Sequence, residues 1–400
     1  MPCIQTRASG NQHISLKGES KCGKSWLRQK NFPDAIVIQC RIEFTPTDIF
    51  RAILANLDIS LEVSSSETRD ARMELRGEGE YGWSLLGKIK ASIGTELSDT
   101  ENSKYEPIGR DVNDLEFVCA VIRESGRRVV IEDFHYLSGD AQRNLAHDLK
   151  AMWDFGIYVV IIGVWVKQNY LTYLNPDLAG RIREISIYWS HDDLREVVSK
   201  GCSHLKITIS KQILDQIVID SFGNVGLLQS LTIETLDEAD IHQKSHRVQE
   251  CTDIRFFEDA ALSYAEQLEA VFLEFARRTS SGIRSRRGST GIYAHTMWAV
   301  FDSEDDELIK GVNVNTIFDR ASARQPRIQK ANLRSILPRI DELQIDDRGK
   351  GLVVTFVEQS ESVAVVDRSV LFYRKYSTIN WPWHEIANAA ADNEMGEHQG

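Results

Sequence analysis

One eight-residue run near the N-terminus restricts the possible folds of this chain more than any other part of it. Gly18-Glu19-Ser20-Lys21-Cys22-Gly23-Lys24-Ser25 fits the pattern G-x-x-x-x-G-K-[ST] of a phosphate-binding loop. Its glycines let the backbone wrap around phosphates, the lysine reaches the β- and γ-phosphates, and the serine hydroxyl holds Mg²⁺. The run therefore predicts a binding site for a nucleotide such as ATP together with Mg²⁺.

The sequence on either side of this loop supports the prediction. His13-Ile14-Ser15-Leu16 alternates as a short strand does, and Ser25 to Lys30 is typical of a helix. A strand, a glycine-rich turn and a helix are the order that the motif requires, and the helix N-terminus adds a positive dipole end. The alternative is a chance glycine turn.

A second segment supplies the acids that such a site needs. Val129-Val130-Ile131-Glu132-Asp133 is an apolar strand that ends in two carboxylates. Glu132 is predicted to hold Mg²⁺ together with Ser25, and Asp133 to orient and deprotonate the attacking water. Two alternatives remain open. The acids could begin the following helix, or they could hold Mg²⁺ without rapid hydrolysis.

The first part of the chain alternates strands and helices, which predicts an α/β fold with a parallel sheet over residues 1–190. Within it, residues 60–113 are rich in serine, glycine and acids, so they are expected to be a long loop with one short helix or a partly disordered insertion. Further strands are expected at 34–40, 128–133, 157–164 and 184–189, and helices at 46–57, 114–126 and 140–154.

The rest of the chain is predicted to be mainly helical. We expect a helical lid at 191–240, then a helical segment that ends in a Ser/Gly/Arg linker at 241–291. Residues 292–387 show three helical patterns followed by two strands, 352–357 and 362–366, which is typical of a winged-helix-like α+β domain. Residues 388–400 are polar and are expected to be a flexible tail.

Composition excludes some classes of protein. The chain contains no apolar run long enough for a membrane span, and Met1 to Gly10 lacks the apolar centre of a secretory signal. Six scattered cysteines without C-x-x-C pairs fit a cytoplasmic protein. The net charge of −12 argues against non-specific nucleic-acid binding by the whole chain.

The charge is distributed unevenly. Twelve Lys/Arg and only six Asp/Glu lie between Arg277 and Arg339. Such a basic segment favours DNA as a partner of the winged-helix-like domain, and Arg327, Lys330 and Arg334 would lie on one side of its recognition helix. The alternatives are a protein partner, or basic residues that only keep the surface soluble.

Five features, in their order along the chain, resemble those of an AAA+ P-loop ATPase. They are the phosphate-binding loop, the strand ending in Glu132-Asp133, a strand ending in Ile161-Ile162-Gly163, an arginine before the last strand, and a helical lid. The resemblance covers roughly residues 12–240. Within that superfamily it is most similar to prokaryotic transposition and secretion ATPases and to origin-recognition-type initiators, which also end in winged helices. It implies ATP binding between subunits, a homo-oligomer, and a partner that responds to the nucleotide state.

The arginine is Arg181, and in this scheme it would act on the γ-phosphate of a neighbouring subunit. A surface salt bridge is its alternative role. Three features depart from the family pattern. The acids are in the order Glu-Asp, Gly223-Asn224-Val225-Gly226 has glycine where a lid arginine is common, and few residues precede the first strand. A start codon assigned too late would also explain the last feature.

The sequence thus predicts an ATPase that hydrolyses ATP to ADP and phosphate and acts as an ATP-dependent switch or assembly factor. Two alternatives stay open. One is a non-hydrolysing DNA-binding regulator that responds to nucleotide, and the other is a protein-only signalling adaptor.

Overall fold

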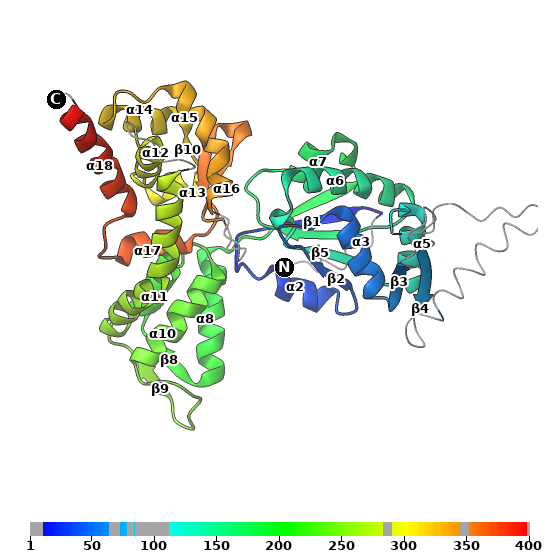
Figure 1. Ribbon diagram of the computed structural model, residues 1–400. Helices are drawn as coiled ribbons and strands as arrows, with labels where there is room; N and C mark the ends of the chain where they lie inside the picture. Colours follow the sequence, from blue (N-terminus) through cyan, green and yellow to red (C-terminus); the bar gives the residue numbers. More distant parts are fainter. Residues whose placement is uncertain are drawn as a thin grey trace, which may run out of the picture. The chain divides into compact units, whose positions relative to one another are not determined.

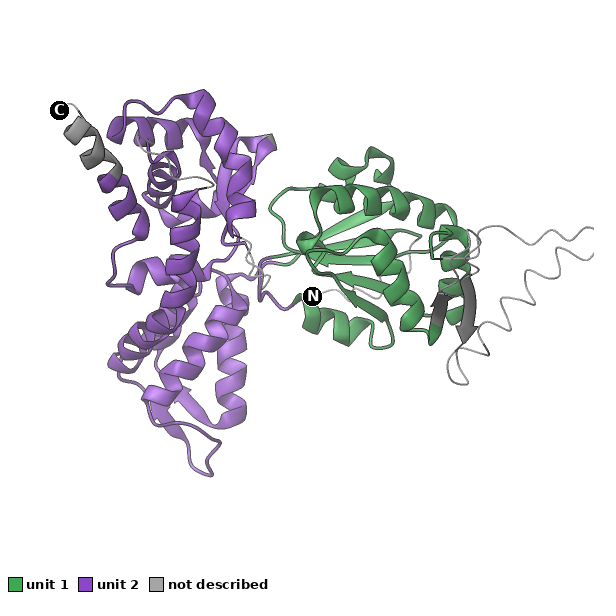
Figure 2. Ribbon diagram, in the orientation of Figure 1, with its two compact units in different colours: residues 1–18, 24–187 green, residues 19–23, 188–400 purple. Residues whose placement is uncertain are grey.

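The computed structural model describes residues 11–63, 73–77, 84, 112–282, 290–344 and 352–397. The chain divides into two compact units (Figure 2). Residues 1–18 and 24–187 form the first unit, and residues 19–23 and 188–400 form the second. The middle of the phosphate-binding loop therefore belongs to the second unit by its contacts, although the strand and helix that flank the loop belong to the first.

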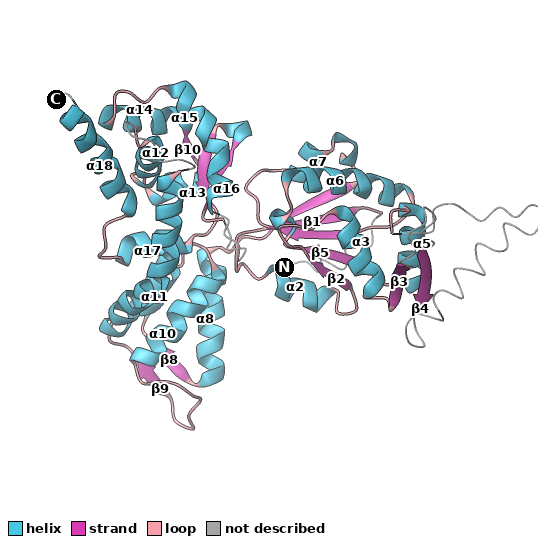
Figure 3. Ribbon diagram, viewed as in Figure 1, coloured by secondary structure: helices cyan, strands magenta, loops and turns pink. Residues whose placement is uncertain are grey.

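A five-stranded parallel sheet forms the centre of the first unit (Figures 1 and 3). Its spatial order is β2-β5-β6-β1-β7. All residues of β1, β5 and β6 are buried, as is usual for parallel strands covered on both faces. The strands are β1 (His13–Lys17), β2 (Ile36–Gln39), β5 (Val129–Glu132), β6 (Val160–Gly163) and β7 (Ile182–Ser186).

Helices and strands of the first unit share one hydrophobic core. Helix α3 begins with a capping box between Thr45 and Asp48, and helix α5 ends at Gly126, whose φ of 64° is the left-handed conformation that glycine adopts easily. These are the ends that the sequence predicted. The helices are α2 (Lys24–Asn31), α3 (Pro46–Ala55), α5 (Leu115–Ser125), α6 (Gly139–Asp154) and α7 (Tyr170–Leu174).

The segment 60–113 contains structure that the sequence did not predict. Strands β3 (Ile59–Val63) and β4 (Met73–Gly77) pair in antiparallel fashion. The segment therefore includes a two-stranded sheet at its start. The short helix expected from Ser84 lies almost entirely outside the described residues.

The first part of the second unit is the predicted helical lid. Two short strands that the sequence did not reveal, β8 (Ile207–Ile209) and β9 (Gln249–Cys251), pair in parallel within it. A long helix, α11 (Arg255–Ser281), follows. The other lid helices are α8 (His191–Leu205), α9 (Lys211–Asp220) and α10 (Val225–Glu238).

The C-terminal part has a winged-helix arrangement. Three strands form an antiparallel sheet in the order β10-β12-β11. Strands β11 (Val354–Val357) and β12 (Ser362–Val365) match the predicted pair, whereas β10 (Val312–Asn313) was missed because it has only two residues. The helices are α12 (Ile292–Phe301), α13 (Asp305–Lys310), α14 (Val314–Arg324), α15 (Lys330–Ile336) and α16 (Ile340–Gln344).

Two helices end the described part of the chain. The apolar and aromatic stretch from Val370 to Tyr376 lies in the buried helix α17 (Ser369–Tyr376). Helix α18 (Pro382–Glu397) follows, and its Trp383 and Ala387 are buried in the core.

One hydrophobic core runs through the whole second unit, from Leu194 in the lid to Ala387 in α18. Helix α11 contacts α10 of the lid and also α12, α17 and α18. The lid and the winged-helix arrangement are therefore packed as one body. Within the described part of the chain, no helix combines the length and the apolar character that crossing a membrane requires.

Candidate nucleotide-binding site

The phosphate-binding loop has the backbone shape that binds anions. It follows β1 directly and leads into α2 at Lys24. Lys21 and Gly23 have positive φ angles of 58° and 93°, and alternation of this kind makes a concavity of backbone N–H groups. A Cβ at Gly23 would meet nothing within 4 Å, so the reason for glycine there is its backbone conformation rather than crowding.

Two side chains of the second unit fix the orientation of peptide groups in the loop. The Asn224 Nδ2 donates to the Ser20 carbonyl at 2.8 Å, and the Trp189 Nε1 donates to the Cys22 carbonyl at 3.0 Å. In a trans peptide the C=O and the next N–H point in opposite directions. The N–H groups of Lys21 and Gly23 therefore point away from these donors, as an anion cradle requires.

The side chain of Lys24, the lysine of the motif, folds back over the loop. The Lys24 Nζ donates to the Gly18 carbonyl at 3.0 Å. Its ammonium group is thus held at the mouth of the loop by a backbone oxygen of the same loop. Ser25, the predicted Mg²⁺ ligand, is exposed in the first turn of α2.

The two predicted acids lie at the same edge of the sheet as the loop, because β1 and β5 are parallel and both features follow the carboxyl ends of their strands. Glu132 is the last residue of β5 and is only 9% exposed. Asp133 follows it in the left-handed conformation with φ 57°. The sequence prediction placed both residues at this edge.

Each acid has a partner that the sequence analysis missed. The Arg28 Nε lies 3.0 Å from Glu132 Oε1, and the Gln39 Nε2 donates to Asp133 Oδ2 at 3.0 Å. Arg28 lies one helical turn after Lys24 in α2, and Gln39 is in register with Glu132 on the neighbouring strand. The end of a strand neighbouring β5 could have indicated the contact of Gln39 with Asp133, whereas the contact of Arg28 with Glu132 follows only from the strand order.

A buried histidine lies next to this acidic pair. His135 follows Asp133 by two residues, and burial lowers its pKa to about 4. The Val164 N–H donates to its Nδ1 at 3.4 Å. His135 is therefore a neutral ring at neutral pH, and it contributes no positive charge to the site.

The segment after β6 is tied to β7 through Glu184. This carboxylate lies 3.0 Å from Lys17 Nζ and accepts from the Asn169 N–H at 3.1 Å. The Lys17 Nζ also donates to the Lys167 carbonyl at 3.2 Å. Gln168 is exposed on this segment.

Arg181 lies at the other edge of the sheet. Its carbonyl accepts from the His13 N–H at 2.9 Å, at the start of β1, whereas the phosphate-binding loop follows the end of β1. Its guanidinium lies 4.8 Å from the centre of the Trp153 ring. Arg181 is thus separated from the loop of its own chain by the length of a strand, and any action on a γ-phosphate would need a second subunit.

The oxygen donors at the site fit Mg²⁺, which prefers oxygen ligands and keeps several waters. The Ser25 hydroxyl and the Glu132 carboxylate are the donors that would hold it. Among the described residues, no group of three or more His, Cys, Asp or Glu side chains forms a closed metal cage. A site completed by water and phosphate oxygens is the type that such a donor set supports.

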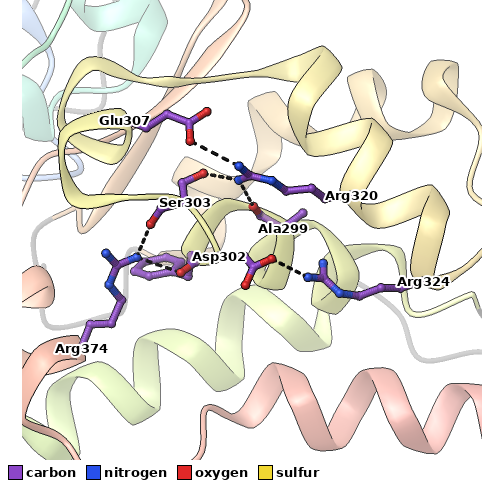
Figure 4. A network of polar contacts seen from close by, with 8 residues as sticks. Ala299, Asp302, Ser303, Glu307, Arg320, Arg324 and Arg374 are labelled. Carbon is purple, nitrogen blue, oxygen red and sulfur yellow. Dashed lines mark hydrogen bonds and ion pairs between the residues drawn. The ribbon is translucent and has the colours of Figure 1, made fainter.

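The basic residues of the C-terminal part are largely committed to internal contacts (Figure 4). Arg320 donates to the Ala299 carbonyl at 3.2 Å and to the Ser303 hydroxyl, and Arg324 donates to Asp302 at 2.8 Å. Arg334, on the predicted recognition helix, lies 2.7 Å from Glu361. Part of the positive charge counted between Arg277 and Arg339 is therefore held in contacts within this part of the chain.

Comparisons with known proteins find distant similarities only. No family model and no curated protein matches the chain. Among solved structures, the Orc1 protein of Aeropyrum pernix in complex with DNA is 10% identical, with a TM-score of 0.36 over 94% of this chain and 88% of that one. RuvB of Thermotoga maritima, a Holliday junction branch migration motor, is 12% identical, with a TM-score of 0.35 over 94% and 91%.

A STAND protein with a tetratricopeptide repeat sensor from Pyrococcus horikoshii is 11% identical, with a TM-score of 0.34. It matches 99% of this chain, which covers 44% of that longer protein. Identities this low assign no residue a role here. The chain's own strand order and the loop that follows β1 give the first unit a parallel α/β fold of the type that the sequence predicted.

Proposed function

We propose that this chain binds Mg-ATP at Gly18–Ser25 and hydrolyses it to ADP and phosphate as an ATP-dependent switch. The observation that supports the proposal is that the loop follows the carboxyl end of β1, and Glu132 and Asp133 lie at the carboxyl end of β5 in the same parallel sheet. A phosphate cradle with carboxylates at the end of a nearby strand is the arrangement that phosphoryl transfer needs.

Each residue has a defined task in this proposal. Lys24 neutralises phosphate charge after leaving the Gly18 carbonyl, and Ser25 and Glu132 hold the magnesium shell. The metal, when bound, neutralises charge that develops on the phosphates. Asp133 accepts a proton from water while the water oxygen bonds to the γ-phosphorus and the bond to the ADP oxygen breaks.

Slow turnover is supported by the contacts of the two acids. Glu132 is paired with Arg28, and Asp133 accepts from Gln39, so both acids must change partners before they act. The same observation favours the second candidate, a regulator that binds nucleotide without hydrolysing it. Arg181 acts in this scheme on the site of another copy, which makes a homo-oligomer part of the proposal.

Fewer basic residues near the predicted recognition helix are exposed than the sequence suggested. Arg327 and Arg339 are exposed near the predicted recognition helix, and Arg334 is half exposed. DNA contact through the winged-helix-like part, with Arg327, Lys330 and Arg334 on the predicted recognition helix, and a protein partner are the two candidates. DNA affinity that falls steeply with salt supports the former, and salt-insensitive or absent binding supports the latter.

The decisive test compares nucleotide binding with steady-state ATPase rates in wild type, Lys24→Ala and Asp133→Asn. We expect Lys24→Ala to weaken ATP binding by about 100-fold, because it removes a charge-assisted contact to phosphate. Asp133→Asn should retain binding and lower kcat by about 10²-fold or more. Arg195→Ala, which breaks an Arg–Asp pair in the lid, is the control and should change neither.

The three proposals separate cleanly in this experiment. Lys24-dependent binding without Lys24-dependent turnover would leave the nucleotide-responsive regulator standing. No nucleotide binding by the wild type would leave only the protein adaptor.

A further inference from the structure

His135 lies at the carboxyl edge of the sheet, next to the strand that separates the phosphate-binding loop from the acids. That middle strand is β6, which lies between β1 and β5. Lys17, the last residue before the loop, pairs with Gly163 of β6, and the register of β5 against β6 brings Asp133 to the same level on the other side. Val164, the residue after Gly163, contacts the His135 ring. The imidazole is therefore held at the centre of this edge.

One nitrogen of the His135 ring is used by the backbone that follows β6. The Val164 N–H donates to Nδ1 at 3.4 Å. A ring nitrogen that accepts a hydrogen bond carries no proton, so the ring is neutral and its single N–H is at Nε2. Within the described part of the chain, Nε2 has no hydrogen-bond partner, and the side chain is half-buried. His135 therefore has one N–H donor available for a ligand.

The end of β6 itself is apolar. Residues 163–166 are Gly, Val, Trp and Val. The Trp165 Nε1 donates to Glu184 at 3.4 Å, and the Trp165 ring lies over Gly163, where a Cβ would be 2.2 Å from a ring carbon. These side chains therefore offer a ligand at this edge no donor of their own. The imidazole of His135 supplies the polar group that the middle strand lacks.

Two charged groups of the nucleotide site lie near this ring. Burial lowers the pKa of His135 to about 4, and by smaller amounts the Asp133 carboxylate raises it and the Lys24 ammonium lowers it. A charge acts on a neighbour's pKa in this way only at short range. The ring is therefore close to both groups to which the proposed function assigns the phosphates and the water.

We propose that the Nε2–H of His135 donates a hydrogen bond to the terminal phosphate of bound ATP and so distinguishes ATP from ADP. The inference rests on the proposed function, because it adds a donor to the same nucleotide site. A phosphate oxygen is a charged acceptor, and hydrogen bonds to it are stronger than those between neutral groups. ADP lacks this phosphate, so the contact exists with ATP alone.

The absence of charge on the ring matters for the neighbouring acid. A lysine or arginine at position 135 would form an ion pair with Asp133 and hold the pKa of its carboxyl low. The neutral ring donates to phosphate without this effect. Asp133 therefore keeps the proton affinity that a general base needs.

The first test measures the affinity of AMP-PNP, a non-hydrolysable analogue of ATP, and of ADP by isothermal titration with Mg²⁺ present. His135→Asn keeps an acceptor close to the position of Nδ1 but has no donor that reaches the position of Nε2. It should weaken AMP-PNP binding by about tenfold, because a charge-assisted hydrogen bond is lost, and change ADP affinity by less than about twofold. His135→Gln, whose amide reaches the position of Nε2, should weaken AMP-PNP binding by less than about threefold.

Selectivity for the terminal phosphate decides the outcome. Equal losses of AMP-PNP and ADP affinity in His135→Asn would mean that the ring only supports the site, and unchanged affinities would mean that it contacts no nucleotide; either result overturns the proposal. Thermal unfolding checks each variant. If His135→Asn does not fold, His135→Phe, which keeps a ring of similar size without nitrogen, takes its place with the same expected loss.

A second test needs no nucleotide. Long-range ¹H–¹⁵N spectra distinguish the two neutral tautomers of a histidine ring, and the signal lost in His135→Asn assigns this ring. At pH 7 its proton should be on Nε2. A proton on Nδ1 overturns the proposal, because Nε2 then has nothing to donate. AMP-PNP should shift the Nε2 signal, whereas ADP should leave it close to its nucleotide-free position.

Two controls keep this result apart from the proposed function. If the wild type binds neither nucleotide, or binds both no better than Lys24→Ala does, the proposed function and this inference fail together. Lys24-dependent binding without an AMP-PNP-selective loss in His135→Asn overturns the inference alone. His147→Asn, the same change at an exposed histidine of α6, should leave both affinities unchanged.

Discussion

Arginines serve the loop region and the C-terminal region of this molecule in different ways. Near α12, Arg374 donates to the Phe301 carbonyl at 2.8 Å and to the Ser303 carbonyl at 2.6 Å (Figure 4). Near the phosphate-binding site, Arg28 and Arg368 each form an ion pair with one carboxylate. The first arrangement satisfies carbonyls at a helix end, where no intrahelical donor is available.

The difference lies in what can replace each contact. Backbone carbonyls at the end of α12 stay in place as long as the helix exists, so Arg374 keeps these two partners in addition to its ion pair with Asp305. A side-chain carboxylate can be replaced as a partner by phosphate or by a cation. We therefore expect changes in the α12 network to lower stability, and changes at the loop to alter ligand binding.

The largest effect should come from Arg374→Ala. The change leaves two carbonyls without their donor and Asp305 without its ion pair, so the free energy of unfolding should fall by about 3–5 kcal/mol. Urea unfolding measures this. ATP affinity of the folded fraction should not change. Arg334→Ala, which breaks a half-exposed pair, should cost less than about 1 kcal/mol.

Acid should destabilise the first unit by a comparable amount. His13 is buried, its Nε2 lies 2.8 Å from the Leu149 carbonyl, and its Nδ1 accepts from the Val159 N–H. Burial lowers its pKa from 6.5 to about 4. The unfolded chain takes up this proton first, so stability present above pH 6.5 is lost as pH falls toward 4, by about 3 kcal/mol.

Urea midpoints at pH 7, 5.5 and 4.5 measure this loss. His13→Gln keeps one donor and one acceptor but cannot be protonated, so its midpoint should fall less with acid than that of the wild type. An identical fall in both proteins would assign the acid sensitivity to other groups, of which His135 has the same depressed pKa.

The smallest of the three effects should be seen with Arg28→Ala. Glu132 then loses its ion pair while still nearly buried, and the free energy of unfolding should drop by about 1–2 kcal/mol. Added Mg²⁺ should restore part of this loss, because a cation can replace the guanidinium. Arg51→Ala on α3, which breaks an exposed pair, should show neither effect. If Mg²⁺ does not stabilise Arg28→Ala, Glu132 is not a metal ligand in the absence of nucleotide.

Much of the first unit could be predicted from sequence because its signals are local. The glycine spacing, the apolar strands and the acids after β5 each follow from residues close together in the chain. The partners of these residues could not be predicted equally well. Glu132 meets Arg28 from a helix 104 residues away, and only the strand order brings them together.

The second unit was harder to predict because its contacts join distant segments. The stretch from Val370 to Tyr376 is apolar and aromatic, which does not by itself indicate a helix, and its aromatic side chains pack against α11 from a distant part of the chain. In the sequence, Arg320 and Arg324 counted as surface charge. In the structure, groups at the end of α12 and just after it accept their hydrogen bonds. Arg368 had no sequence signal, because its partner Glu19 is the variable second residue of the motif.

Helix α11 has a practical consequence for anyone who divides this chain into pieces. On one side its Phe272 stacks near Tyr373, and its Phe275 lies near Phe301, so the two aromatic partners come from the winged-helix part. A fragment that starts at α12 would leave Phe301 and Tyr373 facing water. A cut before α11, by contrast, would strip α10 of its main packing partner. Expression of the second unit is therefore expected to succeed only from α8 onward.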